Sequence, residues 1–206
     1  MNTYFDIESA PESDEVLNAL MPEFTAPANY KDPDKIKSNI AEQQAQWKER
    51  AALSAESGRI LVIGIMDGTG FNVFEGDEKQ LLSDFWGWLA IHQLDNGHQV
   101  IGFNIMDFDL PFIVRRSWKH NIQMPRIVRA GRYWNELIVD LMQLWACGNR
   151  QQTIGLDRLA KYLGVGAKNG DGKDFAKLLA SDRKAAMAYL ENDLALLKSC
   201  AGRVGL

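Results

Sequence analysis

Cysteine is scarce in this sequence, and long apolar runs are missing. The two cysteines, Cys147 and Cys200, form no C-x-x-C pair, which argues against a disulfide framework and against a zinc site built on cysteine. No stretch approaches the ~20 apolar residues that a membrane-spanning helix needs. The first residues, MNTYFDIESAP, lack the basic and then apolar pattern of a secretion signal. We therefore expect a protein of the reducing cytoplasm that does not associate with membranes.

Positive charge is also in short supply. Lys and Arg number 23 against 27 Asp and Glu, which gives a net charge of −4 over 206 residues. Proteins that hold nucleic acid mainly through its phosphates are usually basic, so this chain would hold little of a duplex backbone. A bound metal ion could supply positive charge at one point. One local basic cluster would either steer a phosphate backbone or form a solvated surface. Its members are Arg115, Arg116, Lys119, Arg126, Arg129 and Arg132.

The order of predicted elements indicates one mixed α/β domain over residues 1–206. Residues 9–58 interrupt the pattern with a polar, proline-bearing stretch and one amphipathic helix that begins at Asp32-Pro33. We interpret them as an insertion. A hairpin followed by strands that alternate with helices predicts a mixed sheet flanked by helices. Strands are expected at 3–8, 59–66, 71–75, 99–104 and 137–141, and later helices at 78–93, 110–120, 154–163, 174–180 and from 182 onward.

Two carboxylates lie two residues apart in the first predicted strand. Asp6 and Glu8 would point to the same face, roughly 6.5 Å apart along the strand. Such a pair is costly to bury unless a cation lies between the two groups, and oxygen-only ligands favour Mg²⁺ or Mn²⁺ over zinc. The pattern alone is weak, because an edge strand with both carboxylates in solvent would show it too.

A second acidic position follows the strand at 99–104. The segment GFNIMDFD, residues 102–109, leads from an apolar strand into a turn, and a helix is expected next. Asp109 stands where a side chain can cap a helix N-terminus, so the segment fits capping and metal binding equally well. Asp107 is an alternative ligand, and Asn104 would either fix the turn or contact substrate. Asp140, at the end of the last strand, is expected to be structural.

The last predicted helix, with Ser181 as its expected cap, carries a tyrosine and an acid four residues apart. Tyr189 and Asp193 therefore share one helix face. Asp193 stands at the edge of an apolar stripe, which indicates that it points into the protein or into a cleft. For this helix alone, an ordinary amphipathic boundary would give the same pattern.

Together and in this order, the three motifs resemble the DEDD superfamily of 3′–5′ exonucleases, which is DnaQ-like and ribonuclease H-like. Tyrosine in the third motif is typical of its DEDDy branch, whereas the other branch has histidine where this chain has Ala188. The segments KDPDKI, ALSAESGRILVIGI and GFNIMDFDLPFIVRR are similar to predicted stand-alone exonucleases related to the proofreading domain of family B DNA polymerases. The motif residues are Asp6, Glu8, Asn104, Phe108, Asp109, Tyr189 and Asp193.

The resemblance implies a ribonuclease H-like sheet of five strands, three antiparallel and then two parallel, and a site for two Mg²⁺ or Mn²⁺ ions. Asp6 would bridge the ions, Glu8 and Asp193 would complete the shell of the first, and Asp109 would hold the second. Tyr189 would orient the attacking water, since a hydroxyl with a pKa near ~10 is a poor base at neutral pH.

The resemblance also implies a substrate and partners. The substrate would be nucleic acid with a free 3′ end, single-stranded DNA rather than RNA, contacted by Asn104, by Phe108 and by Ser9, which stands where many relatives have threonine. A DNA polymerase or another replication or repair protein would be a partner in trans.

Other functions fit the same fold. They are an RNA-trimming 3′–5′ exoribonuclease, a non-catalytic nucleic-acid-binding or polymerase-associated module, and a metal phosphatase or nucleotide hydrolase. The intact set of four carboxylates and a tyrosine argues against the module, and the lack of a D-x-D followed by Thr or Val argues against an aspartyl-phosphate enzyme.

Overall fold

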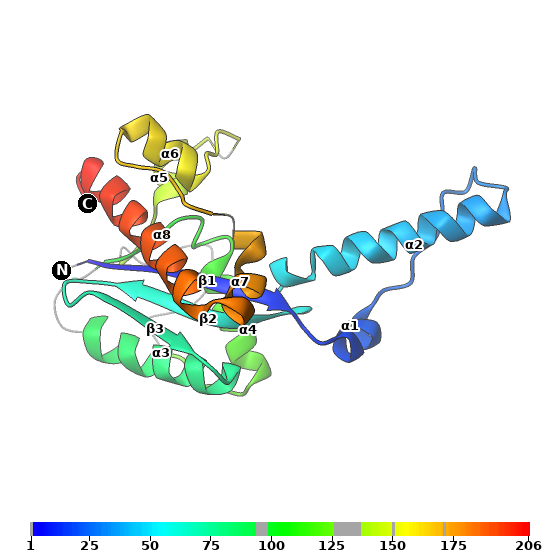
Figure 1. Ribbon diagram of the computed structural model, residues 1–206, viewed down its shortest axis with the longest axis horizontal. Helices are drawn as coiled ribbons and strands as arrows, with labels where there is room; N and C mark the ends of the chain where they lie inside the picture. The colour runs from blue at the N-terminus through cyan, green and yellow to red at the C-terminus, as the bar shows by residue number, and fades with distance from the viewer. Residues whose placement is uncertain (1, 94–98, 126–136, 150, 171) are drawn as a thin grey trace. The chain divides into compact units, whose positions relative to one another are not determined.

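The computed structural model describes residues 2–93, 99–125, 137–149, 151–170 and 172–206 (Figure 1). Two compact units make up the chain. The larger consists of Met1–Glu8 and Ile60–Leu206, and the smaller of Ser9–Arg59. No helix among the described residues is both long enough and apolar enough to cross a membrane.

A five-stranded sheet in the order β3-β2-β1-β4-β5 forms the centre of the fold. β2 pairs antiparallel with β3, whereas β1 pairs parallel with β4, and β4 parallel with β5. This arrangement confirms the predicted mixed sheet, and it makes β1 the central strand. The strands are β1 (Thr3–Pro11), β2 (Gly58–Met66), β3 (Phe71–Glu75), β4 (Val100–Gly102) and β5 (Ile138–Asp140).

Helices cover both faces of the sheet (Figure 1). Successive strand residues point to opposite faces: Tyr4 lies in a core with Leu190 of α8, whereas the ring of Phe5 lies 5.7 Å from that of Phe85 in α3. A Cβ atom on Gly64 of β2 would lie 2.7 Å from the Leu190 side chain, so α8 can lie this close only over a glycine. The helices are α3 (Glu78–Gln93), α4 (Asp109–Lys119), α5 (Leu141–Ala146), α6 (Leu156–Leu163), α7 (Phe175–Ser181) and α8 (Arg183–Arg203).

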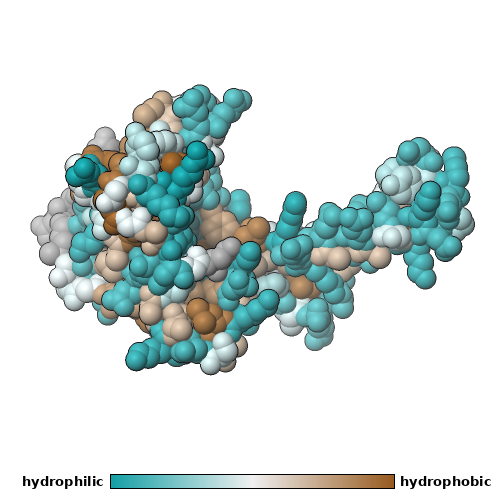
Figure 2. Space-filling view, turned by 45° about the horizontal axis from the view of Figure 1, so that its top comes forward, coloured by the Kyte–Doolittle hydropathy of each residue, from teal (hydrophilic) through white to brown (hydrophobic). Residues whose placement is uncertain are grey.

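The smaller unit contains the helices α1 (Asp14–Leu20) and α2 (Pro33–Glu49). Asp32 caps α2 as predicted, because its carboxylate accepts a hydrogen bond from the Asp34 N–H at 2.9 Å. No residue of α2 is buried, and hydrophilic residues cover most of the surface of this unit in Figure 2. The interpretation of this segment as an insertion in a single domain stays a prediction.

The predicted cap of α8 is wrong. Asp182, not Ser181, accepts a hydrogen bond from the Ala185 N–H, at 3.0 Å. The Ser181 hydroxyl instead donates to the Lys177 carbonyl, 3.0 Å away within α7. Ser181 still belongs to the preceding helix, and the chain is free to start a new one only at the residue after it.

Candidate active site

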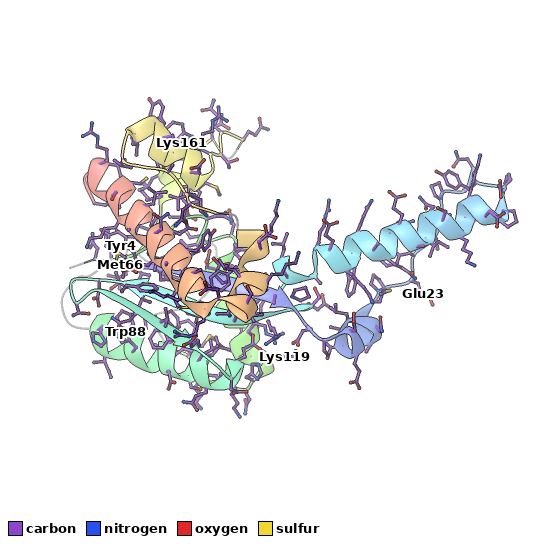
Figure 3. The ribbon with its side chains drawn as sticks, in the orientation of Figure 1. Tyr4, Glu23, Met66, Trp88, Lys119 and Lys161 are labelled. Atoms are coloured by element: carbon purple, nitrogen blue, oxygen red, sulfur yellow. The ribbon has the colours of Figure 1, made fainter. Side chains whose placement is uncertain are left out.

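The central strand β1 directs its two acidic side chains toward α8. Asp6 and Glu8 follow Tyr4 at alternate positions, so all three side chains lie on the same face of the sheet. Figure 3 shows Tyr4 beside Met66 in the core beneath α8. Glu8 is buried and Asp6 half-buried, and their carboxylates therefore meet whatever α8 presents.

α8 presents Tyr189 and Asp193 to this face. Both residues are buried, with 5% and 2% of their surfaces exposed. Carboxylate oxygens of Asp6, Glu8 and Asp193 all lie within 4.8 Å of one another. The Tyr189 hydroxyl and Oδ1 of Asp193 are buried without a hydrogen-bond partner among the described residues. Buried polar atoms are rarely left unpaired, so both atoms are available to a ligand of the cluster.

Asp109 joins the cluster from the first residue of α4. Its carboxylate accepts a hydrogen bond from the Ile7 N–H at 3.1 Å, and the Asp6 carboxyl group lies close enough to interact with it electrostatically. The capping interpretation is wrong, because the N-cap is Phe108 and no side chain caps this helix.

Asp140 holds the turn that carries Asp109. Its carboxylate accepts hydrogen bonds from the N–H groups of Asn104 at 3.0 Å and Met106 at 3.1 Å, and from Met142 at 2.9 Å, where it caps α5. Burial raises the pKa of Asp140, and these hydrogen bonds oppose that rise. Asp140 therefore has the expected structural role, because its carboxylate connects the end of β5 to the turn after β4.

The turn itself depends on Asn104. Its backbone adopts a φ of 61°, the left-handed conformation that asparagine tolerates better than most residues. Its carbonyl accepts hydrogen bonds from the N–H groups of Asp107 and Phe108, at 3.2 and 3.0 Å. Of the two roles weighed for Asn104, the structure thus provides the turn, and a substrate contact stays a prediction. Asp107 is exposed.

The other predicted substrate residues lie in two places. Phe108 is half-buried, with its ring 5.6 Å from that of Phe112. Ser9 belongs to the smaller unit, where its hydroxyl donates to the Ala52 carbonyl at 2.7 Å. Their contacts with substrate stay predictions.

The basic cluster does not form one surface. Arg116 is 1% exposed and pairs with Glu78, and His120 also bonds this carboxylate, at 2.8 Å. Arg115 and Lys119 are exposed. Arg126, Arg129 and Arg132 lie outside the described residues.

Lys168 is a site residue that sequence reasoning missed. Its ammonium lies 2.5 Å from the Asp193 carboxylate and 5.5 Å from the centre of the Tyr189 ring. It precedes a glycine-rich stretch whose backbone packs on the site: a Cβ atom on Gly170 would lie 2.8 Å from the Tyr189 ring. Lys168 lies in a loop, and no periodic pattern in the sequence points to it. The glycines that follow it, which allow the close packing, are the one sequence signal that could have indicated its position.

Burial and mutual repulsion raise the pKa values of the Asp6, Glu8 and Asp109 carboxyl groups. Burial, together with the charge of Asp193, raises the pKa of Asp6 to about 6. Burial and the neighbouring carboxylates raise the pKa of Glu8 to about 9, and burial raises the pKa of Asp109 well above its ordinary value. Lys168 opposes the shifts of Asp6 and Glu8. The cluster is therefore built to receive positive charge, either as protons or as a cation.

The donor set fits a hard divalent cation. Three carboxylates whose oxygens lie within 4.8 Å match the all-oxygen coordination that Mg²⁺ and Mn²⁺ prefer. No nitrogen or sulfur ligand occurs in this group of residues, which argues against zinc.

Comparisons with known proteins agree with this picture. A family described as predicted 3′–5′ exonucleases related to the exonuclease domain of PolB matches residues 50–195. This range contains Asp109, Tyr189 and Asp193 but not Asp6 and Glu8, whose place in the site depends on the geometry alone. A search of curated protein sequences finds no match.

The family B DNA polymerase of the hyperthermophilic archaeon Pyrobaculum calidifontis has a similar structure. The TM-score is 0.60 at 18% identity, over 98% of this chain and 24% of the polymerase. At this identity the likeness shows the fold, and the chain spans about a quarter of the length of that polymerase.

Proposed function

The chain belongs to the family of predicted 3′–5′ exonucleases related to the exonuclease domain of PolB, and we propose that it is a metal-dependent nuclease. On this proposal it hydrolyses phosphodiester bonds from the 3′ end of nucleic acid, with single-stranded DNA as the preferred substrate. The observation that carries the proposal is the meeting of four acidic side chains, from β1, α4 and α8, at one place in the fold.

Asp6, Glu8 and Asp193 would hold the divalent cation, with Asp109 beside Asp6 available for a second ion. Bound there, Mg²⁺ or Mn²⁺ would lower the pKa of a water molecule and stabilise the charge that develops on the phosphate and on the leaving oxygen.

The surroundings of Tyr189 support a positioning role for its hydroxyl group. Burial and the nearby carboxylates raise the pKa of this tyrosine, so the hydroxyl stays protonated and donates a hydrogen bond instead of accepting a proton. Because it has no partner among the described residues, it is free to orient a water molecule or a phosphate oxygen. Lys168 neutralises part of the charge on Asp193.

The test uses 5′-labelled single-stranded DNA and RNA oligonucleotides with Mg²⁺, Mn²⁺ or EDTA. We expect a ladder that shortens from the 3′ end, requires metal and disappears in Asp109→Asn. Asp107→Asn is the matched control, because Asp107 lies two residues away and is exposed. Metal-independent cutting, or no cutting by folded protein in either metal, would overturn the proposal. The same gel shows which sugar is preferred.

A polymerase partner and a cytoplasmic location stay predictions.

A further inference from the structure

We propose that α5 and α6 form a second binding surface, which holds the single-stranded body of the substrate by base stacking. This α5–α6 surface consists of Trp145, Arg158, Lys161 and Tyr162. The inference rests on the proposed function, because it names the path of the strand whose 3′ end the carboxylates would hold. It concerns residues outside the carboxylate cluster and outside the three motifs.

Two aromatic side chains stand exposed on this surface. Tyr162 is 72% exposed and Trp145 36%, and their rings meet edge to face with centroids 5.2 Å apart. The pair thus remains open to solvent, and an exposed aromatic pair offers π-faces on which any base can stack, independent of sequence.

The charge around the pair suits a polyanion. α6 carries two exposed cations, Arg158 and Lys161, against one carboxylate, Asp157, a net of +1 in a chain whose net charge is −4. Arg158 and Tyr162 are four residues apart on α6, so they share one helix face, and both are exposed. Cations next to stacking rings are the combination that binds single strands.

The surface is connected to the site by contacts. Lys168 pairs with Asp193 through its ammonium, while its backbone N–H donates to the Asp157 carboxylate at 2.9 Å. Asp157 in turn pairs with Lys161 at 2.6 Å. Figure 1 shows α5 and α6 next to each other beside α8, and Figure 3 places Lys161 on α6. Two contacts of Lys168 therefore connect the carboxylate cluster to α6.

These observations favour single-stranded nucleic acid over a protein partner. A protein interface is depleted of charge at its centre, whereas here the two aromatic rings have exposed cations, Arg158 and Lys161, as neighbours on α6. Base stacking does not depend on the net charge of the protein. It therefore adds affinity that a negatively charged chain cannot obtain from electrostatic attraction to phosphates alone.

Binding is measured by fluorescence anisotropy with labelled oligothymidylates of increasing length, in EDTA so that no strand is cut. We expect Tyr162→Ala and Trp145→Ala each to weaken binding of long strands by about fivefold or more, the range typical of one lost stacking contact. Binding of a dinucleotide is expected to stay unchanged. Tyr162→Phe keeps the ring and is expected to bind like the wild type.

Trp118→Ala is the matched control, because Trp118 is 63% exposed on α4 and is not part of the α5–α6 surface. Unchanged long-strand binding in both alanine variants, or an equal loss in the control, overturns the inference and leaves the pair as a docking surface for protein. Cleavage with unchanged binding would overturn only this inference. Binding that depends on Tyr162, without any cleavage in metal, would overturn only the proposed function.

Discussion

The carboxyl group of Asp109 makes two different contacts with the central strand. It accepts a hydrogen bond from the Ile7 backbone and interacts electrostatically with the carboxyl group of Asp6. The first contact needs only an acceptor oxygen, whereas the proposed second metal site needs negative charge. Substitutions that differ in these two properties therefore separate the structural role of Asp109 from the proposed catalytic one.

We predict that Asp109→Asn abolishes nuclease activity and that Asp109→Ala adds a loss of stability. The asparagine oxygen still accepts the bond from Ile7, but the charge is gone, so a fall of two orders of magnitude or more in cleavage rate is expected. Alanine leaves the buried N–H unpaired, which costs about 1–3 kcal/mol. Single-turnover cleavage and urea unfolding of both variants check this. An active asparagine variant would contradict it.

The Tyr189 hydroxyl allows a prediction in which activity and stability separate. Because this buried hydroxyl has no hydrogen-bond partner among the described residues, Tyr189→Phe removes no bond and is expected to leave the metal-free protein as stable as the wild type or more so. The cleavage rate is expected to fall by about 10- to 100-fold, since positioned hydrogen-bond donors contribute at this scale. Thermal unfolding in EDTA and the rate of strand shortening are the measurements. A less stable variant with normal activity would assign the hydroxyl to the core.

At the scale of elements, the turn between β4 and α4 depends on β5. The Asp140 carboxylate accepts hydrogen bonds from backbone N–H groups of the turn and of the start of α5. These two segments follow the neighbouring strands β4 and β5, so one carboxylate fixes where both helices start. Loss of this carboxylate is expected to move the first residue of α4, which is Asp109.

We predict that Asp140→Ala destabilises the protein by about 2 kcal/mol or more, because it leaves three part-buried N–H groups unpaired and removes a helix cap. It is also expected to weaken metal binding, although the hydrogen bonds of Asp140 go to the turn and to α5 and not to the cluster. Asp107→Ala in the same turn serves as the control, because that side chain is exposed. Urea unfolding and isothermal titration with Mn²⁺ are the measurements. Equal stability of the two variants would show that the turn holds its shape without Asp140.

Elements with strong periodic patterns were predictable from the sequence. The hairpin β2–β3 and α3 lie where the apolar spacing placed them. The short helices α1 and α5, of 7 and 6 residues, were not expected, since so few residues give no clear period. β4 ends at Gly102, earlier than expected, because Asn104 takes a left-handed conformation that no strand can continue.

For the candidate site, the sequence could indicate which carboxylates to expect but not how they are arranged. Spacing could place Asp6 with Glu8, and Tyr189 with Asp193, because each pair shares one element. That these pairs meet depends on how α8 lies over β1, which local patterns do not encode. Lys168 was missed for the same reason, since its contact with Asp193 exists only after the loop before α7 has folded back.

At the scale of the whole molecule, the cluster concentrates negative charge in a protein that is already acidic. Burial holds Asp6 and Glu8 at pKa values of about 6 and about 9, above those of an unfolded chain, near ~4. The folded state therefore binds protons more tightly than the unfolded state over this range. Stability that comes from protonated carboxyl groups is present at low pH and is lost as the pH rises through these values.

We predict that the metal-free protein becomes less stable as the pH rises from about 5 to about 9, and that metal reverses this trend. Since a cation replaces the protons that the carboxyl groups lose, stabilisation by Mn²⁺ is expected to grow with pH. At a hundredfold excess over the dissociation constant it reaches about 2.7 kcal/mol. Melting temperatures in EDTA and in Mn²⁺ across this range test it. A metal effect independent of pH would show that the carboxyl groups are already ionised.

The order of the acidic residues along the chain has a consequence for the cell. Ile7 and Asp109, which are joined by a hydrogen bond, are 102 residues apart, and Asp193 comes later still, in α8. A ribosome therefore completes β1 and α4 before the last carboxylate has been made. On the proposed function, the growing chain cannot cut nucleic acid during its own synthesis, and nuclease activity begins only after α8 has left the exit tunnel and folded.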